Sequence, residues 1–255
     1  MPAQLLAAEK LVKTFGATLA VAGADFSVYP GEIFGFLGPN GAGKTTTIKM
    51  MTGLLRPTSG RTLIDGVDVA CRPVEAKRLF GYVPDEPQLY GKLSALEFLN
   101  FIGDVYGLDA ATRKPRILEL LKIFELSGEQ SHLIESYSHG MKQKVALCAA
   151  LLHAPRVYFL DEPTVGLDPK SARLLKDLLR QAADAGAAVF MSTHIMEIAQ
   201  ALCDRVAILH HGDIVGMGSV AELRASSAEQ TLEEVFLSLT GGSNHTSAPL
   251  FGRPA

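Results

Sequence analysis

The chain has 255 residues, 47% of them hydrophobic, which predicts a globular protein with a sizeable core, either one domain with a lobe or two small domains. Its net charge of −3 comes from interspersed acids and bases, so the sequence lacks the excess of positive charge that is typical of proteins that bind nucleic acid. We therefore expect no nucleic-acid partner. No window offers the ~20 uninterrupted apolar residues of a membrane span, and the N-terminus lacks a basic signal-peptide region, so we expect a cytosolic protein.

The first third of the chain has mainly strand character. Short apolar or alternating runs bounded by Pro and Gly predict strands. Such runs occur at 5–15, 18–29, 33–37, 61–66 and 81–83. The run at 61–66 ends in Asp65-Gly66, a hairpin signal, and a helix is expected from Gly43 to about Leu54.

The character changes between Pro84 and about Pro155, where helical periodicity replaces β-branched residues. Ser94 with Glu97 three residues later forms a capping box, which predicts a helix start. Helices are expected at about 94–106, 112–126 and 140–153. We interpret this stretch as an inserted helical lobe.

Strands and helices alternate after residue 155, which favours a parallel sheet covered by helices. Strands are expected at 156–161, 187–192, 205–210 and 214–218, and helices at 169–183, 195–202 and 231–240. The residues beyond Gly241 are rich in Gly, Ser and Pro, and we expect a disordered tail.

A phosphate-binding loop, G-P-N-G-A-G-K-T-T, follows the strand at 33–37. Its glycines let backbone N–H groups approach phosphate oxygens, and the following helix directs its positive end at the anion. Lys44 is expected to reach the β- and γ-phosphates, and Thr45 to place its hydroxyl on Mg²⁺. The expected nucleotide contacts of this loop are Gly38, Pro39, Asn40, Gly41, Ala42, Gly43, Lys44, Thr45 and Thr46.

Two further strand ends are expected to carry polar groups into the same crevice, where open α/β sheets bind ligands. Asp161 ends the strand V-Y-F-L-D and is a candidate Mg²⁺ ligand, while Glu162 is placed to polarise a water that attacks the γ-phosphate. His194 follows another strand and is expected to sense the γ-phosphate. Asp-Glu-Pro alone is commonly a solvated turn, but its pairing with a phosphate loop favours a catalytic site.

Together these motifs resemble the nucleotide-binding subunit of an ABC transporter, over nearly everything from Leu5 to about Leu239. The resemblance implies an α/β fold: a P-loop NTPase (RecA-like) core with an N-terminal antiparallel β subdomain and an inserted α-helical subdomain. It implies a single ATPase domain over 1–240, with its core at 1–83 and 156–240, the helical subdomain at 84–155 and a disordered tail at 241–255.

The resemblance also implies roles for individual residues. Gly38–Thr46 matches Walker A, and Val157–Glu162 matches Walker B with a catalytic glutamate. Gly166–Asp168 matches the D-loop, and His194 the switch histidine. Phe15 lies where the family stacks an aromatic ring on adenine. Lys44, Glu162 and His194 are thus the expected catalytic residues, and Thr45, Asp161 and Asp85 the expected metal ligands.

A signature segment is expected at Tyr137–Gln143, in the position of the family's L-S-G-G-Q motif. The resemblance implies that Ser138, His139, Gly140 and Met141 face the ATP bound by another subunit, in a head-to-tail homodimer or heterodimer enclosing two ATP molecules. The family's glycine is replaced by His139, whose side chain we expect to point away from phosphate.

The family's Q-loop glutamine is replaced by Asp85. A carboxylate can still hold Mg²⁺ or a water, but it repels the γ-phosphate when no metal lies between them. This departure and His139 leave open a cassette that binds ATP but barely hydrolyses it, whereas Glu162 and His194 argue for hydrolysis.

The resemblance predicts an ATP-hydrolysing, Mg²⁺-dependent subunit at the cytoplasmic face of the cell membrane. It would power transport, with export favoured, through a permease that is a separate chain. The alternative is a soluble ATPase of the same superfamily that acts on DNA or the ribosome, although long coiled coils, zinc hooks and a second cassette are missing from the sequence. A GTPase or kinase is disfavoured because no N-K-x-D motif occurs.

Overall fold

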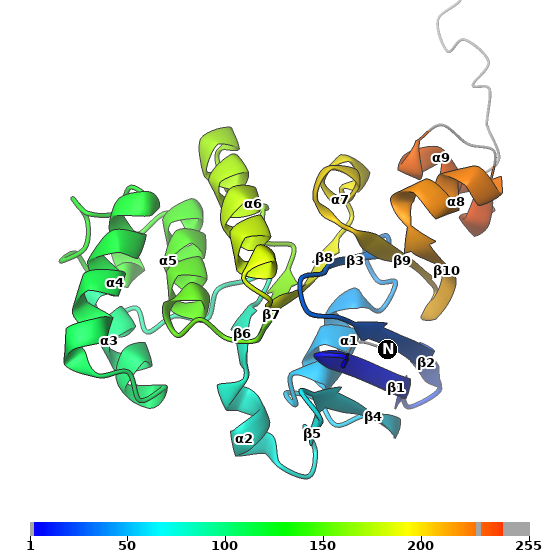
Figure 1. Cartoon of the computed structure of the whole chain (residues 1–255), viewed down its shortest axis with the longest axis horizontal. Coiled ribbons are helices and arrows are strands. Elements are labelled where there is room, and N and C mark those ends of the chain that lie inside the picture. The colour runs from blue at the N-terminus through cyan, green and yellow to red at the C-terminus, as the bar shows by residue number, and fades with distance from the viewer. Residues whose placement is uncertain (1–2, 228–230, 242–255) are drawn as a thin grey trace, which may run out of the picture.

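The computed structural model describes residues 3–227 and 231–241, which form two sheets and the helices around them (Figure 1). A six-stranded sheet has the order β10-β9-β3-β8-β7-β6, and a four-stranded sheet has the order β2-β1-β4-β5. The helices α3, α4 and α5 gather at one end of the molecule, and the four-stranded sheet lies near the other end (Figure 1).

The six-stranded sheet is parallel except for its edge strand β10, which runs antiparallel to β9. Its strands are β3 (Ile33–Leu37), β6 (Phe80–Val83), β7 (Val157–Asp161), β8 (Ala188–Thr193), β9 (Arg205–His210) and β10 (Asp213–Ser219). Leu37 pairs with Thr193, and Asp161 pairs with Ser192, so β3, β7 and β8 end at the same edge. The residues that follow these strands therefore meet at one place.

The four-stranded sheet contains β1 (Leu6–Phe15), β2 (Thr18–Val28), β4 (Ser59–Ile64) and β5 (Val67–Asp68). All its pairings are antiparallel, as the family resemblance implied. Phe26 of β2 stacks on Phe34 of β3 and Phe190 of β8, with ring centroids 5.3 and 5.5 Å apart. This aromatic contact joins the two sheets, and α1 (Lys44–Met51) packs against strands of both.

The helical end contains α3 (Ala95–Val105), α4 (Ala110–Ile123), η1 (Ile134–Ser136) and α5 (His139–Leu152). The predicted capping box is present: Ser94 Oγ accepts from the N–H of Glu97, and a carboxylate oxygen of Glu97 accepts from the N–H of Ser94. Buried side chains of α3, α4 and α5 form one continuous core with those of β6, β7 and α6. The lobe is therefore packed onto the parallel sheet.

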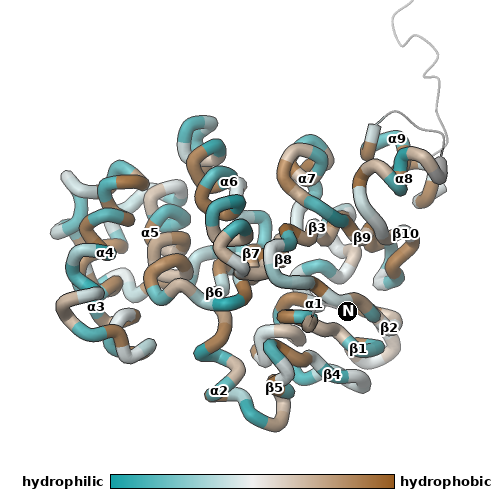
Figure 2. The backbone as a smooth tube through the Cα atoms, in the orientation of Figure 1, coloured by the Kyte–Doolittle hydropathy of each residue, from teal (hydrophilic) through white to brown (hydrophobic). Residues whose placement is uncertain are grey.

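The remaining helices are α2 (Pro73–Arg78), α6 (Pro169–Asp184), α7 (Met196–Leu202), α8 (Val220–Ser227) and α9 (Leu232–Thr240). Helix α6 buries Ser171, Leu175, Leu179 and Ala183, four residues apart, and Figure 2 shows hydrophilic and hydrophobic residues alternating along it. The helices α2 and α8 were absent from the sequence-based expectations.

Most boundary errors have a local cause. The helix predicted to reach Leu54 ends at Met51, because Gly53 adopts a left-handed φ of 70° and the N–H of Leu54 turns back to the carbonyl of Lys49. The helix predicted from Thr112 begins at Ala110, because Asp109 caps it by accepting from the N–H of Thr112.

The predicted fold class is confirmed, whereas the subdomain boundaries at 83/84 and 155/156 stay predictions. The predicted tail beyond Gly241 lies outside the described residues. Within the described ranges, no helix is long and apolar enough to cross a membrane.

Candidate functional site

The loop between β3 and α1 takes its shape from three glycines. A side chain at Gly38 would place its Cβ 2.5 Å from the carbonyl oxygen of Leu209, and one at Gly43 would place it 2.5 Å from that of Ala20. Gly41 and Gly43 also have φ values of 82° and 109°, in the left-handed region that glycine favours. The backbone of β2 and β9 therefore approaches the loop too closely for any other residue.

Lys44, the first residue of α1, lies inside the loop that precedes it. Its side chain is only 6% exposed, and its Nζ donates to the carbonyl oxygens of Gly38 at 2.8 Å and Pro39 at 3.3 Å. The same Nζ lies 3.4 Å from Oε1 of Glu162. An ammonium group is thus held at the start of a helix, beside a carboxylate.

Glu162 follows β7 and lies between Lys44 and His194. Its Oε1 is 3.0 Å from Nδ1 of His194, and its Oε2 accepts from the N–H of His194 at 3.3 Å. The N–H of Glu162 donates to the carbonyl of Ser192, and its φ is 48°, a left-handed value that is strained for glutamate. The structure therefore brings together the three predicted catalytic side chains, although Lys44 lies more than 100 positions before Glu162 and His194 in the sequence.

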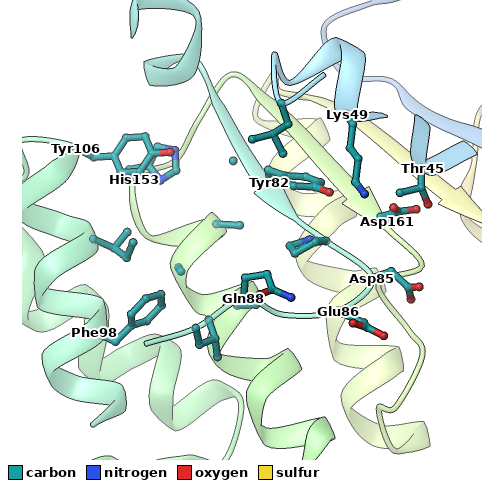
Figure 3. A pocket seen from close by; sticks show the side chains of 18 residues that line it. Thr45, Lys49, Tyr82, Asp85, Glu86, Gln88, Phe98, Tyr106, His153 and Asp161 are labelled. Atoms are coloured by element: carbon teal, nitrogen blue, oxygen red, sulfur yellow. The ribbon is translucent and has the colours of Figure 1, made fainter. Parts of the chain in front are cut away.

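Asp161, the last residue of β7, is completely buried. Its Oδ1 accepts from the hydroxyl of Ser192, while its Oδ2 has no hydrogen-bond partner in the part of the chain that the structure describes. Figure 3 shows Asp161 next to Thr45. A buried carboxylate oxygen without a donor, beside a hydroxyl, suits a hard cation such as Mg²⁺.

No three His, Cys, Asp or Glu side chains of the described residues gather closely enough to hold a metal by themselves. That agrees with the usual binding of Mg²⁺ by one or two protein ligands together with phosphate oxygens and water. Thr45 and Asp161 fit this pattern.

A cavity of about 170 Å³ lies directly over the loop. It is lined by Ala20, Asn40, Gly41, Gly43, Lys44, Thr45, Thr46, Asp85 and Glu162. Pro39 and Ala42 do not line it: Ala42 is buried, and its N–H donates to the carbonyl of Pro39. Gly41, Gly43, Lys44 and Thr45, which were expected to cradle phosphate, therefore surround one space, whereas Gly38 does not line it.

A second cavity of about 610 Å³ adjoins the first and shares Thr45 and Asp85 with it (Figure 3). Asp85 is thus placed where the two meet. Partial burial raises the pKa of Asp85 above its ordinary value, and the negative charges of Asp161, Glu162 and Glu86 raise it further. The departure from glutamine therefore adds a carboxylate to a region already rich in negative charge.

Phe15 lies apart from this cavity, at the end of β1. Its ring is 49% exposed, and Nζ of Lys13 lies 5.0 Å from the ring centroid. The exposed ring leaves area for stacking, but nothing in the structure tests the predicted contact with adenine, which stays a prediction.

The signature segment begins α5 on the surface. Ser138 caps the helix by accepting from the N–H of Met141 at 3.3 Å. None of Ser138, His139, Gly140 and Met141 lines either cavity. The ring of His139 packs against Gly166 of the same chain, the residue that opens the predicted D-loop.

Asp168, in the predicted D-loop, caps α6. Its carboxylate accepts from the N–H and hydroxyl of Ser171, and Nζ of Lys144 lies 3.2 Å from it. The hydrogen bonds from Ser171, followed by Lys144, hold the pKa of Asp168 well below its ordinary value.

Sequence reasoning missed Ser192, whose hydroxyl contacts Asp161 and whose carbonyl accepts from Glu162. It also gave no role to Gln143 and Lys144. A polar residue at a buried strand end, and a glutamine that opens an apolar helical run, were the available signals.

Comparison with known proteins agrees with this geometry. The family model for ABC transporters matches residues 21–165, more than half of the chain. The linearmycin resistance ATP-binding protein LnrL of Bacillus subtilis is 38% identical over 234 residues, which cover 92% of this chain and 75% of LnrL. The chain belongs to the ABC transporter family.

Other matches agree. A solved ATP-binding subunit of an ABC transporter superposes with a TM-score of 0.89 at 35% identity, covering 92% of this chain and 99% of the other. The probable multidrug ABC transporter ATP-binding protein YbhF of Escherichia coli is 38% identical over 240 residues, which cover 92% of this chain but 41% of YbhF. This chain thus spans about two fifths of YbhF. These matches identify the chain as a member of the ATPase subunits of this family.

Proposed function

We propose that this ABC ATPase powers transport of a substrate through a separate membrane permease, to which it attaches at the cytoplasmic face, and that the direction is export. The observation that carries the proposal is the carboxylate of Glu162, within ion-pair distance of both Lys44 and His194 beside the phosphate loop. Export is supported by relatives named for multidrug transport and linearmycin resistance.

In the proposed reaction, Lys44 turns its ammonium from the carbonyls of Gly38 and Pro39 to the phosphates of ATP. Thr45 and Asp161 would hold Mg²⁺, which would supply positive charge to neutralise the phosphates. Glu162 accepts a hydrogen bond from the attacking water and directs it, and His194 donates to the γ-phosphate. Ser192 keeps Asp161 and Glu162 in place from the neighbouring strand.

The proposed working unit is a head-to-tail dimer with two ATP molecules between its subunits. The start of α5 supports it, since Ser138 and Gly140 offer a hydroxyl and backbone N–H groups at a helix N-terminus, which suits an anion. These groups lie outside the cavity that contains Lys44, so an anion bound there comes from another subunit.

The Glu162→Gln variant tests the proposal. Removing the charge while keeping the shape should lower ATP turnover at least about 100-fold, because the water loses its proton acceptor. ATP binding should persist, and gel filtration with ATP and Mg²⁺ should show a more stable dimer than wild type. Unchanged turnover would remove Glu162 from the mechanism, and a strictly monomeric variant would contradict the ATP-enclosing dimer.

The permease is tested by capturing the tagged chain from detergent-solubilised membranes of its source cells and identifying what comes with it. A co-purifying protein with several membrane spans is the expected result. Ribosomal or DNA-associated proteins in its place would support the soluble ATPase of the same superfamily.

A further inference from the structure

The segment from Pro163 to Asp168, here called the 163–168 segment, connects Glu162 to α6. Its internal hydrogen bonds are few: the N–H of Val165 donates to the carbonyl of Glu162, and the N–H of Leu167 donates to that of Thr164. Ser171 of α6 donates to Asp168 at the end of the segment, and further contacts come from α5, which is distant in sequence.

The residues of α5 that contact the 163–168 segment lie on one face of the first two turns of this helix. Gly140 approaches the carbonyl of Gly166 so closely that a Cβ on Gly140 would lie 2.6 Å from it. Nε2 of Gln143 donates to the carbonyl of Pro163 at 3.3 Å, and Nζ of Lys144 lies 3.2 Å from Oδ2 of Asp168. Positions three and four apart share a helix face, so these residues act on the segment together.

These two polar contacts differ from ordinary surface pairs. Gln143 is completely buried, and the Lys144 side chain is only 13% exposed. The carbonyl that Gln143 contacts belongs to the residue directly after Glu162. Because the Glu162 backbone is in a left-handed conformation, it depends on its surroundings to stay there.

We propose that Gln143 and Lys144 are positioning residues that hold the 163–168 segment against α5 and thereby keep the Glu162 carboxylate between Lys44 and His194. This inference rests on the proposed function, in which Glu162 directs the attacking water and the start of α5 contacts the ATP of a second subunit. The inference adds a direct structural link between the start of α5 and Glu162. When α5 moves upon contact with the ATP of the second subunit, the backbone that carries Glu162 shifts with it.

The test compares methionine variants that keep side-chain length but remove the polar contact. Gln143→Met and Lys144→Met should each lower kcat at least about tenfold, since a displacement of ~1 Å at a reacting group can cost about 100-fold in rate. The Kd for ATP with Mg²⁺ should stay within about twofold of wild type, because neither residue lines the nucleotide cavity. Lys144→Arg should retain most of the turnover by restoring the contact with Asp168.

Lys170→Met is the matched control. Lys170 also joins the helical lobe to α6, through an ion pair with Glu125, but its side chain is 78% exposed and does not bond to the 163–168 segment. Its kcat should equal that of wild type. Equal losses of kcat in Lys170→Met and Lys144→Met would show that turnover depends on any contact between the helical lobe and α6, and not on the contact with the 163–168 segment. That result would overturn the proposal.

Two further outcomes also overturn it: unchanged kcat in both methionine variants, or a Kd that weakens in step with kcat. If Gln143→Met does not fold, Lys144→Met and its arginine rescue still decide the question. Glu162→Gln is measured in the same assay. Turnover retained in Glu162→Gln refutes the proposed function, whereas turnover lost there but kept in both methionine variants refutes this inference alone.

Discussion

The helices α1 and α5 of this protein begin in different ways and in different surroundings. Helix α1 follows Gly43, which provides no side-chain cap, and its first residue, Lys44, is buried in a cavity with Glu162. Helix α5 follows Ser138, whose hydroxyl accepts from the N–H of Met141, and its first turn lies outside that cavity. The start of α1 has its cation and carboxylate within one chain, whereas the start of α5 would meet the ATP of a second subunit in the proposed dimer.

The largest effect should come from removing the cation at the start of α1. Lys44→Ala deletes the ammonium group and should weaken ATP binding at least about 100-fold, since charge-assisted contacts to phosphate are among the strongest in a site. Displacement of a fluorescent ATP analogue measures it. Micromolar ATP affinity in the variant would contradict the role given to the phosphate loop.

A negative charge introduced at the start of α5 should weaken the association of the two subunits and leave ATP binding by one subunit unchanged. Ser138→Asp keeps the helix cap, because aspartate caps as well as serine, but sets a negative charge facing the partner's phosphate. ATP-dependent dimerisation should weaken at least about tenfold, while the ATP affinity of the monomer stays the same. Thr231→Asp, the equivalent change at the cap of α9, is the control. A fall in monomer affinity would show that the two helix starts are not separate sites.

The Asp85 carboxylate offers a way to measure how negative charge at the nucleotide cavity affects ATP binding. Asp85→Asn should strengthen binding of ATP in EDTA a few-fold, because one negative charge leaves the border of the nucleotide cavity, and should change binding of Mg²⁺–ATP less. Glu86→Gln, which removes a neighbouring carboxylate outside that cavity, is the control. Equal changes with and without Mg²⁺ would rule out a cation between Asp85 and the phosphates.

The smallest effect concerns Asp168, behind the start of α5. Its folded-state pKa lies below its ordinary value of 3.8, so the charged carboxylate stabilises the fold above about pH 4 and this contribution is lost as pH falls. Asp168→Asn keeps the cap of α6 but removes the charge beside Lys144. The urea midpoint of the variant should be slightly below that of wild type at pH 7, and the difference should shrink as the pH falls below about 4. A difference in urea midpoint that does not change with pH would show that the charge of Asp168 is not its cause.

The elements around the nucleotide cavity were predictable because their signals are local. Glycines close to Lys44 and a carboxylate at a strand end fix loop shape and residue type within a few positions. The shared edge of β3, β7 and β8 followed from parallel pairing, which also made the meeting of Glu162 with His194 foreseeable.

Contacts between distant segments were not predictable in the same way. The position of His139 against Gly166, and of Gln143 against Pro163, depends on how α5 packs on the sheet, and periodicity only reports which helix face is apolar. Helix α2 was missed because six residues carry too few periods, and because Pro73 looks like a turn residue until it is seen at the first helical position.

The left-handed backbone of Glu162 has a consequence for how this protein can change. Glycine adopts φ near 48° without strain, and asparagine tolerates it better than glutamate does. A selection for heat-resistant variants should therefore favour Gly or Asn at position 162, and both substitutions delete the carboxylate that we propose directs the attacking water. At this single residue, substitutions that raise heat stability should therefore lower ATP turnover.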